Sequence, residues 1–432
     1  MLIAASLLFY SVGSLMHLPL LLAVAAVNYL VGLLFQRQVK QKKLILILAL
    51  MLNLGALVIF KYLDFFTDSV NSLFGSSVPL AGLSLPIGIS FFTFQGLSYT
   101  MDVYRDPEVG TKSFLELLLY ISFFPQLIAG PIVKYHDVAL QIRSRNASIQ
   151  DMAAGCRRFI VGLSKKLLLA DLLAVAVDAI YANSALSDAR LSLVAGICYA
   201  LQIYFDFSGY SDMAIGMGRM FGFHFLENFD HPYAAGSIRE FWRRWHISLS
   251  SWFREYLYIP LGGNRRGLTR TCLNVLIVFF LTGLWHGASR TFVLWGLWHG
   301  LWSVLERVTP LKRLSGTVFG HLYTLIIVVL GFMLFRADSV SQAFTMIGSL
   351  FTGYGFSQEA TLLLREVLTG KVIAAAAIGL LLSTGLQRKL TGWAENKQPL
   401  TAAAYIGALA LFALCILRLA SASFNPFIYF QF

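Results

Sequence analysis

Long apolar runs alternate with short basic segments along most of the chain. Leu2–Phe9 begins this pattern as a short apolar stretch. A bilayer crossing needs about 17–25 mostly apolar residues. We therefore expect crossings near His17–Phe35, Leu44–Tyr62, Leu80–Tyr99, Phe159–Ile180, Leu191–Phe207, Leu273–Trp285, Thr291–Leu305, Leu322–Phe335, Lys371–Leu386 and Ala402–Leu419. The pattern predicts an all-α polytopic membrane protein with about 10–11 transmembrane helices.

The polar segments between the runs predict an orientation. Basic loops should face the cytoplasm, and they are Arg37–Lys43, Lys134–Lys166, Arg239–Arg270, Lys312–Arg313 and Arg388–Lys397. Asp64–Pro79 has two acids and no base, so it should face outward. This arrangement requires Phe114–Ile128 and Met213–Phe225, both interrupted by proline or glycine, not to cross. We expect re-entrant or interfacial helices there, around a central funnel or tunnel.

Composition agrees with a membrane location. Hydrophobic residues make up 57% of the chain and charged residues 13%, against about 25% charged residues in soluble domains. The net charge of +12 comes from short clusters between apolar runs, which is typical of membrane topology and not of a nucleic-acid-binding face. We expect membrane lipid as a partner and no nucleic acid. The four cysteines are scattered, so neither disulfides nor a metal site are expected.

The segment Phe241–Arg266 is too polar to span and unusually aromatic. At helical spacing it carries an apolar stripe, formed by Phe241, Trp245, Leu249, Trp252 and Tyr256. One interpretation is an amphipathic interfacial helix anchored by tryptophan and arginine. The other is a cytoplasm-facing ledge whose guanidinium groups bind an anionic ligand in a bidentate way. The arginines concerned are Arg243, Arg244, Arg254, Arg265 and Arg266.

The pentapeptide Gly-Leu-Trp-His-Gly occurs twice, at Gly283–Gly287 and Gly296–Gly300. Histidine transfers protons near neutral pH, and an ionisable residue among membrane helices suggests a functional site. On one helix, His286 and His299 would lie about 20 Å apart and on different faces. We expect a turn after Gly287, which leaves His286 at a helix end facing a cavity. His299 we interpret as a buried, hydrogen-bonded structural histidine.

Seven ordered blocks give the chain a resemblance to a known family. They are Leu85–Arg105, Leu127–Val138, Gln202–Tyr233, Phe241–Gly267, Leu281–Gly300, Phe335–Ser339 and Phe427–Phe432. The chain resembles the membrane-bound O-acyltransferase (MBOAT) family, in particular the bacterial branch typified by the alginate O-acetyltransferase membrane subunit. The resemblance implies one transmembrane domain over residues 1–432 with a catalytic core near 85–335. Family members usually carry one further N-terminal hydrophobic helix.

The resemblance also implies roles for individual residues. His286 matches the family's catalytic histidine and is expected to act as a general base. His246 matches the second family site and is expected to orient the reactants or to donate a hydrogen bond to the developing oxyanion. We expect the substrate-binding residues to be Arg243, Arg244, Trp245, Arg254, Asn264 and Trp285.

The activity implied by the resemblance is O-acyl transfer at the bacterial cytoplasmic (inner) membrane. The donor is a thioester, acetyl-CoA, used as a substrate and not as a tightly bound cofactor. The acceptor is a hydroxyl of an exported cell-surface polysaccharide or of an extracytoplasmic acetyltransferase partner. Two alternatives stay open: D-alanyl transfer to teichoic acid, and a multipass transporter or flippase of an anionic or lipid-linked substrate.

Overall fold

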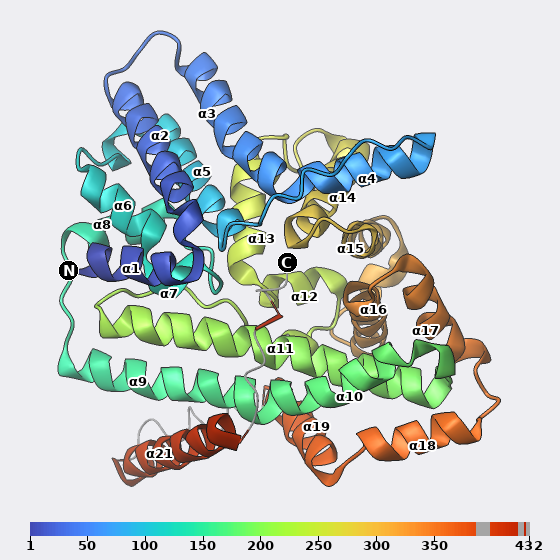
Figure 1. Cartoon of the computed structure of the whole chain (residues 1–432). Coiled ribbons are helices and arrows are strands. Elements are labelled where there is room, and N and C mark those ends of the chain that lie inside the picture. The colour runs from blue at the N-terminus through green and yellow to red at the C-terminus, as the bar shows by residue number, and fades with distance from the viewer. Residues whose placement is uncertain (386–397, 422–426, 429–432) are drawn as a thin grey trace. The chain divides into compact units, whose positions relative to one another are not determined.

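The computed structural model describes residues 1–385, 398–421 and 427–428, and this part of the chain consists of helices without any strand (Figure 1). The all-α prediction is confirmed. The chain divides into two compact units. Unit 1 comprises Met1–Cys156, Ala214–Leu226 and Arg254–Tyr256. Unit 2 comprises the described parts of Arg157–Met213, Glu227–Phe253 and Leu257–Phe432.

Six helices in the described part of the chain are long and apolar enough to cross a membrane. They are Leu2–Gln36 (α1 Leu2–Ser14, η1 Leu15–His17, α2 Leu18–Gln36), Lys42–Phe74 (α3 Lys42–Leu57, η2 Val58–Tyr62, α4 Leu63–Phe74), α11 (Ala189–Met220), α14 (Gly267–His286), α16 (Val318–Arg336) and the Ala403–Ser421 part of α21 (Gln398–Ser421). A seventh crossing is present if the bent pair α18 (Gln358–Val367) and α19 (Gly370–Ser383) counts as one span. The prediction of a polytopic membrane protein is confirmed, with fewer full spans than the expected 10–11.

Two segments differ from their predicted form. Leu80–Tyr99 is not one crossing, because residues 80–86 have no regular structure and the helix α5 (Ile89–Arg105) begins only after Gly88. Met213–Phe225 was expected to form a re-entrant or interfacial helix, but residues 213–220 are instead the end of the long helix α11, which passes unbroken through Gly216. Gly155 lets α9 (Ile149–Ser164) approach α11 closely, since a Cβ on Gly155 would lie 2.6 Å from the Gly216 carbonyl oxygen.

The segment Phe114–Ile128 is short and interrupted, as predicted. It forms α6 (Phe114–Ser122) and α7 (Phe124–Leu127). The central funnel or tunnel stays a prediction.

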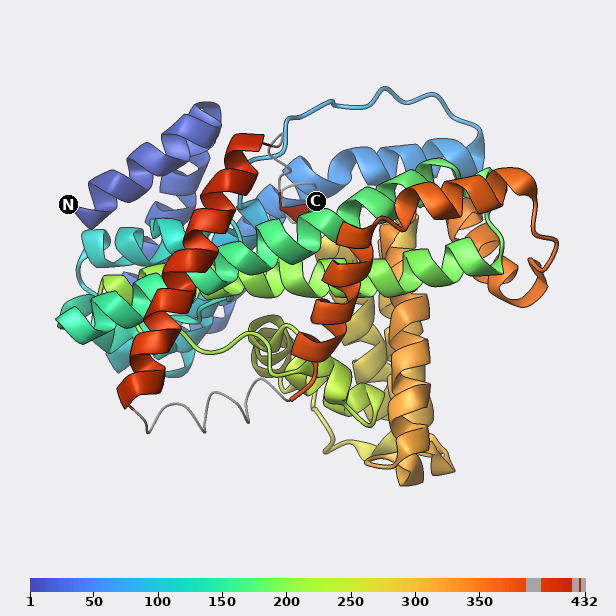
Figure 2. The same ribbon diagram turned by 90° about the horizontal axis from the view of Figure 1, so that it is seen from below.

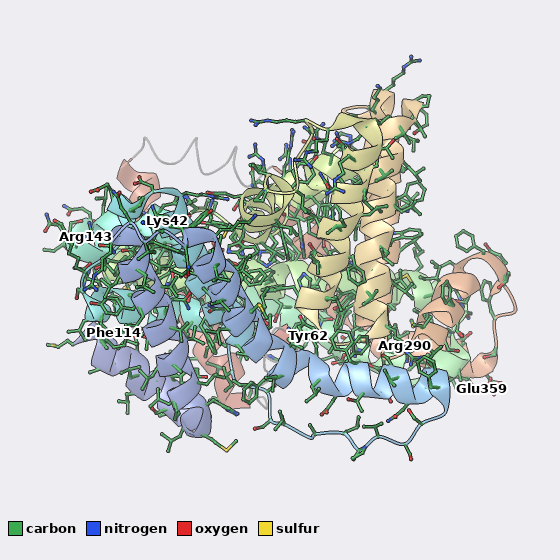
Figure 3. The ribbon with its side chains drawn as sticks, turned by 90° about the horizontal axis from the view of Figure 1, so that it is seen from above. Lys42, Tyr62, Phe114, Arg143, Arg290 and Glu359 are labelled. Atoms are coloured by element: carbon green, nitrogen blue, oxygen red, sulfur yellow. The ribbon has the colours of Figure 1, made fainter. Side chains whose placement is uncertain are left out.

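Unit 1 is built around α5. This helix packs against α2, α3, α6 and α8 (Tyr135–Arg143), and most of its side chains are buried in protein, not exposed to lipid. Asn28 on α2 joins α3 and α5. Its NH₂ group donates to Asn53 on α3 at 2.9 Å, and its amide oxygen accepts from the Thr100 hydroxyl on α5 at 2.6 Å. Figure 3 shows α4 continuing beyond Tyr62 with residues 75–88 returning beside it. Asp64 holds this return by accepting from two backbone N–H groups.

Unit 2 contains the helices that carry the paired pentapeptides. Helix α10 (Asp171–Ala182) lies beside the first part of α11 (Figure 1), and α16 runs across their direction (Figure 2). The remaining helices include α15 (Arg290–Val308), which packs on α14 and α16, and α17 (Val340–Thr352). Among the described residues, three segments are π-helical: η2 in unit 1, η4 (Lys165–Ala170) in unit 2, and η7 (Arg254–Tyr258).

The first glycines of the two pentapeptides meet where α14 and α15 cross. A Cβ on Gly283 would lie 2.4 Å from the Phe292 carbonyl oxygen, and one on Gly296 would lie 2.3 Å from the Phe279 carbonyl oxygen. The same Cβ on Gly296 would lie 3.0 Å from Gly283 Cα. The repeat therefore places two helix backbones in direct contact, which only glycine permits.

Candidate active site

His286 lies at the end of α14, as the sequence predicts. Gly287 caps the helix, and α15 begins at Arg290 after a short turn. The His286 side chain is buried, with 2% of its surface exposed. Its ring contacts Trp285, Trp295 and Phe335 at centroid distances of 5.0, 4.9 and 5.3 Å. The imidazole thus sits in an aromatic cage at a helix end.

The structure brings His246 to the same place. Its ring centroid lies 6.3 Å from that of His286, 5.7 Å from Trp285 and 4.6 Å from Phe207. Burial lowers the pKa of His246 to about 3, so the ring is neutral at physiological pH. Two histidines from separate segments therefore flank Trp285, which contacts both.

The helix expected over Phe241–Tyr256 is broken at His246. Helix α12 (Ile238–Arg244) ends before Trp245, and α13 (Ile247–Phe253) starts after His246. His246 has φ +44°, a left-handed conformation that costs a non-glycine residue about 1–3 kcal/mol. The five stripe residues are all buried within the protein, so an interfacial helix with a lipid-facing stripe is wrong.

His299 occupies a different environment from His286. Its side chain is fully buried and contacts Trp242 at 5.2 Å and Trp295 at 5.3 Å. Its predicted burial is confirmed, but its predicted hydrogen bonding is wrong: no described residue hydrogen-bonds either ring nitrogen. Gly331 makes room for this ring, since a Cβ there would lie 2.7 Å from His299 Nε2.

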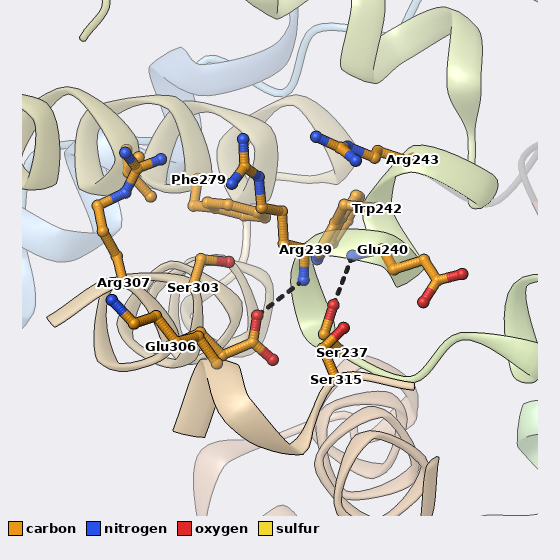
Figure 4. A pocket seen from close by; sticks show the side chains of 12 residues that line it. Ser237, Arg239, Glu240, Trp242, Arg243, Phe279, Ser303, Glu306, Arg307 and Ser315 are labelled. Carbon is orange, nitrogen blue, oxygen red and sulfur yellow. Dashed lines mark hydrogen bonds between the residues drawn. The ribbon is translucent and has the colours of Figure 1, made fainter. Parts of the chain in front are cut away.

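A cationic cavity of about 660 Å³ opens in unit 2 between α12, α14 and α15. It is lined by Ser237, Arg239, Glu240, Trp242, Arg243, Val275, Phe279, Ser303, Glu306, Arg307, Lys312 and Ser315. Figure 4 shows the guanidinium groups of Arg239, Arg243 and Arg307 on one side, next to the rings of Trp242 and Phe279. Partial burial, then the charges of Arg243 and Arg307, lower the pKa of Arg239.

The carboxylates of the cavity do not neutralise these arginines. Glu306 accepts hydrogen bonds from the backbone N–H groups of Ile238 (2.6 Å) and Arg239 (3.1 Å). Glu240 pairs with Arg244, at 2.8 Å, as its position four residues earlier suggests. Within the described residues, no carboxylate lies within 4.0 Å of the charged nitrogens of the cationic cavity. The concentrated positive charge fits an anionic ligand.

Aromatic rings join the cationic cavity to His286. Trp242 lines the cavity and lies 5.6 Å from Trp295, which lies 4.9 Å from His286. The indole N–H groups of Trp242 and Trp295 donate to no described residue.

The predicted substrate-binding residues lie in several places. Arg243 lines the cationic cavity and Trp285 contacts both histidines. Trp245 is buried against Phe241 and other aromatic rings and does not line the cavity. Arg244 is held by a carboxylate of its own helix.

The last two predicted residues lie away from the cavity lining. Asn264 accepts a hydrogen bond from Tyr258. Arg254 is exposed and belongs to unit 1.

Sequence reasoning missed Arg239, Arg307 and Lys312 in the cavity lining. Arg239 precedes Arg243 by four residues on α12, a spacing that places both on one helix face. That signal was available. Arg307 comes from the end of α15, and no sequence pattern relates it to α12.

One cluster in unit 1 has the composition of a metal site. Ligand atoms of Asp102, His136 and Glu255 lie within 4.8 Å of one another. Lys134 Nζ lies 2.9 Å from Glu255, however, and hydrogen bonds to Asp102 and Asp137 raise the pKa of His136 to about 10. In the structure these groups form an ion-pair network.

A multi-pass membrane protein with two neighbouring buried histidines, and with a cationic cavity in the same unit, fits a transferase or a transporter, and comparison with known proteins separates the two. Residues 86–340 match the model of the membrane-bound O-acyltransferase family. The chain is 39% identical to the probable alginate O-acetylase of Pseudomonas putida, over 100% of this chain and 94% of that protein. The chain belongs to the membrane-bound O-acyltransferase family, and it is a membrane O-acyltransferase.

More distant relatives act on other polymers by their names. The peptidoglycan O-acetyltransferase of Helicobacter pylori is 38% identical over 71% of this chain and 62% of that protein. The teichoic acid D-alanyltransferase of Bacillus subtilis is 28% identical over 48% of this chain and 55% of that protein. The family match and the names of these relatives favour acyl transfer over the transporter alternative.

Proposed function

We propose that this enzyme transfers an acetyl group from acetyl-CoA to a hydroxyl of an exported cell-surface polysaccharide at the bacterial inner membrane. The transfer is direct or passes through an extracytoplasmic acetyltransferase. The similarity to the alginate and peptidoglycan enzymes favours acetyl over D-alanyl transfer, because it covers more of the chain at higher identity. The observation that carries the proposal is the aromatic connection between His286 and the cationic cavity.

The cavity supplies what the coenzyme end of the donor requires. Arg239, Arg243 and Arg307 would bind its phosphate groups, since guanidinium groups bind phosphate in a bidentate way. The donor's amide-containing arm would then follow Trp242 and Trp295, whose N–H groups can donate to its carbonyl oxygens. The thioester would reach the aromatic cage around His286.

At the cage, His286 would act as a general base. It removes the proton of the acceptor hydroxyl while the hydroxyl oxygen attacks the thioester carbonyl carbon. The tetrahedral intermediate collapses, the C–S bond breaks, and the imidazolium returns the proton to the leaving thiolate. The products are the O-acetyl ester and the free thiol. The buried surroundings strengthen these proton transfers by excluding water.

The test uses the purified full chain in proteoliposomes with radiolabelled acetyl-CoA and an oligosaccharide acceptor. The His286→Ala variant should lose about 10²–10⁴-fold in kcat, which is the usual contribution of a general base. The control is His224→Ala, which removes an exposed histidine outside this site. Equal activity of His286→Ala and wild type, at equal folded amounts, would exclude this role.

The same assay addresses the acceptor. Transfer to the polymer in the absence of any other protein supports the direct route. Transfer only after addition of an extracytoplasmic acetyltransferase supports the relay. D-alanyl thioester replacing acetyl-CoA without loss of rate would favour the teichoic acid alternative.

A further inference from the structure

We infer that Asn228 is the positioning residue that holds the His246 imidazole with its proton on Nδ1, so that Nε2 acts as a hydrogen-bond acceptor during acyl transfer. The inference rests on the proposed function, because it assigns a role to the second histidine of that site. Asn228 lies between α11 and α12 and is buried. Its amide oxygen lies 3.1 Å from His246 Nδ1.

The orientation of the Asn228 amide follows from its neighbours. The backbone N–H of Ser248 can only donate, and it lies 3.2 Å from the same amide atom that faces His246. That atom must therefore be the oxygen. The Ser248 hydroxyl also donates to it, at 2.8 Å. On the other side, the Asn228 NH₂ group donates to Ser211 Oγ at 3.0 Å.

The amide oxygen in turn determines the tautomer of His246. A carbonyl oxygen can only accept, and the Ser248 hydroxyl, 3.4 Å from Nδ1, already donates to that oxygen at the shorter distance of 2.8 Å, so Nδ1 carries the hydrogen. The buried ring is neutral and has one proton, which leaves the lone pair on Nε2. In this form Nε2 cannot donate a hydrogen bond to an oxyanion. Of the two roles expected for His246, the structure favours orientation: Nε2 accepts a hydrogen bond from a reacting hydroxyl.

Backbone and ionic contacts hold Asn228 in place. Its carbonyl oxygen accepts from the Ile247 N–H at 2.9 Å, directly after the left-handed His246. The preceding residue, Glu227, is bound by Arg158 at 2.6 Å. The same guanidinium binds Asp212 on α11 at 2.9 Å. Asn228 is therefore held through its own carbonyl group and through the preceding residue, Glu227. The hydrogen bond from Ile247 to Asn228 also stabilises the strained backbone of His246.

The direct measurement is the ¹⁵N spectrum of the histidine side chains in the full chain, labelled with ¹⁵N-histidine and placed in lipid nanodiscs. Comparison with His246→Gln identifies the His246 signals. We expect a protonated Nδ1 and an unprotonated Nε2 from mildly acidic to mildly alkaline pH. A proton on Nε2 in the wild type would overturn the inference, whatever the activity of any variant.

Two substitutions test the consequence for catalysis. Asn228→Ala removes the acceptor and should lower kcat about 10²-fold or more with little change in KM, because the ring then loses its required tautomer. Asn228→Asp keeps an oxygen acceptor facing Nδ1, so it should keep the Nδ1-protonated ¹⁵N pattern and retain more of kcat than Asn228→Ala does. Ser211→Ala is the matched control, because it removes only the partner of the NH₂ group.

The outcomes are distinct from those of the His286 experiment. A wild-type ¹⁵N pattern in Asn228→Ala, or equal losses of kcat in Asn228→Asp and Asn228→Ala, contradicts the inference, even if His286→Ala is inactive. If His286→Ala stays active while His246 shows the expected tautomer, the proposed function fails and the placement of the proton stands. If Asn228→Ala does not fold, the ¹⁵N spectra of the wild type and of Asn228→Asp still test on which nitrogen His246 carries its proton.

Discussion

At the scale of single residues, neighbouring arginines of α12 have opposite roles. Arg243 faces the cationic cavity without a carboxylate partner among the described residues, and Arg244 is bound to Glu240. The charge of Arg244 is therefore already compensated. That of Arg243, like those of Arg239 and Arg307, is available to a ligand.

This contrast gives a prediction for donor binding. Arg239→Gln and Arg307→Gln should each raise KM for acetyl-CoA about 10-fold or more, since a hydrogen bond to a charged group contributes about 1.5–3 kcal/mol. The value of kcat should change little, because both residues lie away from His286. Steady-state kinetics at varied donor concentration measure both constants.

Arg244→Gln serves as the control for Arg239→Gln, because it removes a paired guanidinium of the same helix. It should leave KM for the donor nearly unchanged. If Arg239→Gln and Arg307→Gln also leave KM unchanged, the cationic cavity does not bind the coenzyme. Increasing salt should weaken donor binding in the wild type more than in Arg239→Gln.

The sequence indicates some of these residues and not others. His286 stands out because a histidine in a repeated motif interrupts an apolar run, and a glycine after it predicts the helix end. The catalytic role proposed for it came from the family resemblance. Asn228 has no local signal, since only the folded chain places its amide beside His246, a residue of the next segment.

At the scale of elements, the repeated pentapeptide is explained by helix packing. Gly283 and Gly296 are the first residues of the two copies, and they form the contact between α14 and α15. The two histidines, each three residues later, are thereby carried to opposite helices around Trp295, which contacts both. The repetition indicates a close helix crossing and not two equivalent catalytic sites.

This contact predicts a sharp difference between two glycine substitutions. Gly296→Ala places a methyl group 2.3 Å from a backbone oxygen of α14, which has no flexible side chain to move. We expect destabilisation by about 1–3 kcal/mol or more, together with reduced activity, because the shift displaces His286. Gly348→Ala, in the helix α17, meets no atom within 4 Å. It should be neutral or slightly stabilising.

Thermal unfolding of both variants in the same detergent checks this prediction. The midpoint should fall by several degrees for Gly296→Ala and stay the same or rise for Gly348→Ala. Equal midpoints for the two variants would show that the α14–α15 contact accommodates the added methyl group without loss of stability, and would contradict the prediction.

The break between α12 and α13 shows why an element could not be predicted. Trp245-His246 contains neither glycine nor proline, so helical spacing continues through it in the sequence. Tertiary contacts impose the break, because the loop around Asn228 binds the backbone on the far side of His246. Local pattern identifies the buried positions correctly but not the change of helix direction between them.

At the scale of the whole molecule, hydropathy identifies the membrane class, and the described part of the chain has six or seven helices long and apolar enough to cross, against the expected 10–11. An apolar run can face lipid or other helices, and α5 illustrates the second case with almost every side chain buried in unit 1. By contrast, only 17% of the most apolar window of Lys42–Phe74 is buried. The sequence does not separate the two cases, since lipid and protein interior favour the same side chains.

The stability of unit 1 depends on the ion-pair network around His136. This imidazole lies 3.0 Å from Asp102 and 3.3 Å from Asp137. Tyr256 of the η7 segment donates to the same Asp102 at 2.7 Å, and Lys134 binds Glu255 beside it. The protonated form of His136 therefore joins α5, α8 and η7.

This network predicts how stability varies with pH. Hydrogen bonds to Asp102 and Asp137 raise the pKa of His136 in the folded protein to about 10, above the unfolded value of about 6.5. The folded state therefore binds an extra proton between these values, and its stability falls as pH rises through that range. Below about pH 6.5 the contribution is complete, because both states are protonated. His136→Gln should lower the unfolding midpoint at neutral pH and flatten its decline toward pH 10. Melting curves of both proteins across this range would contradict the prediction if their midpoints decline in parallel.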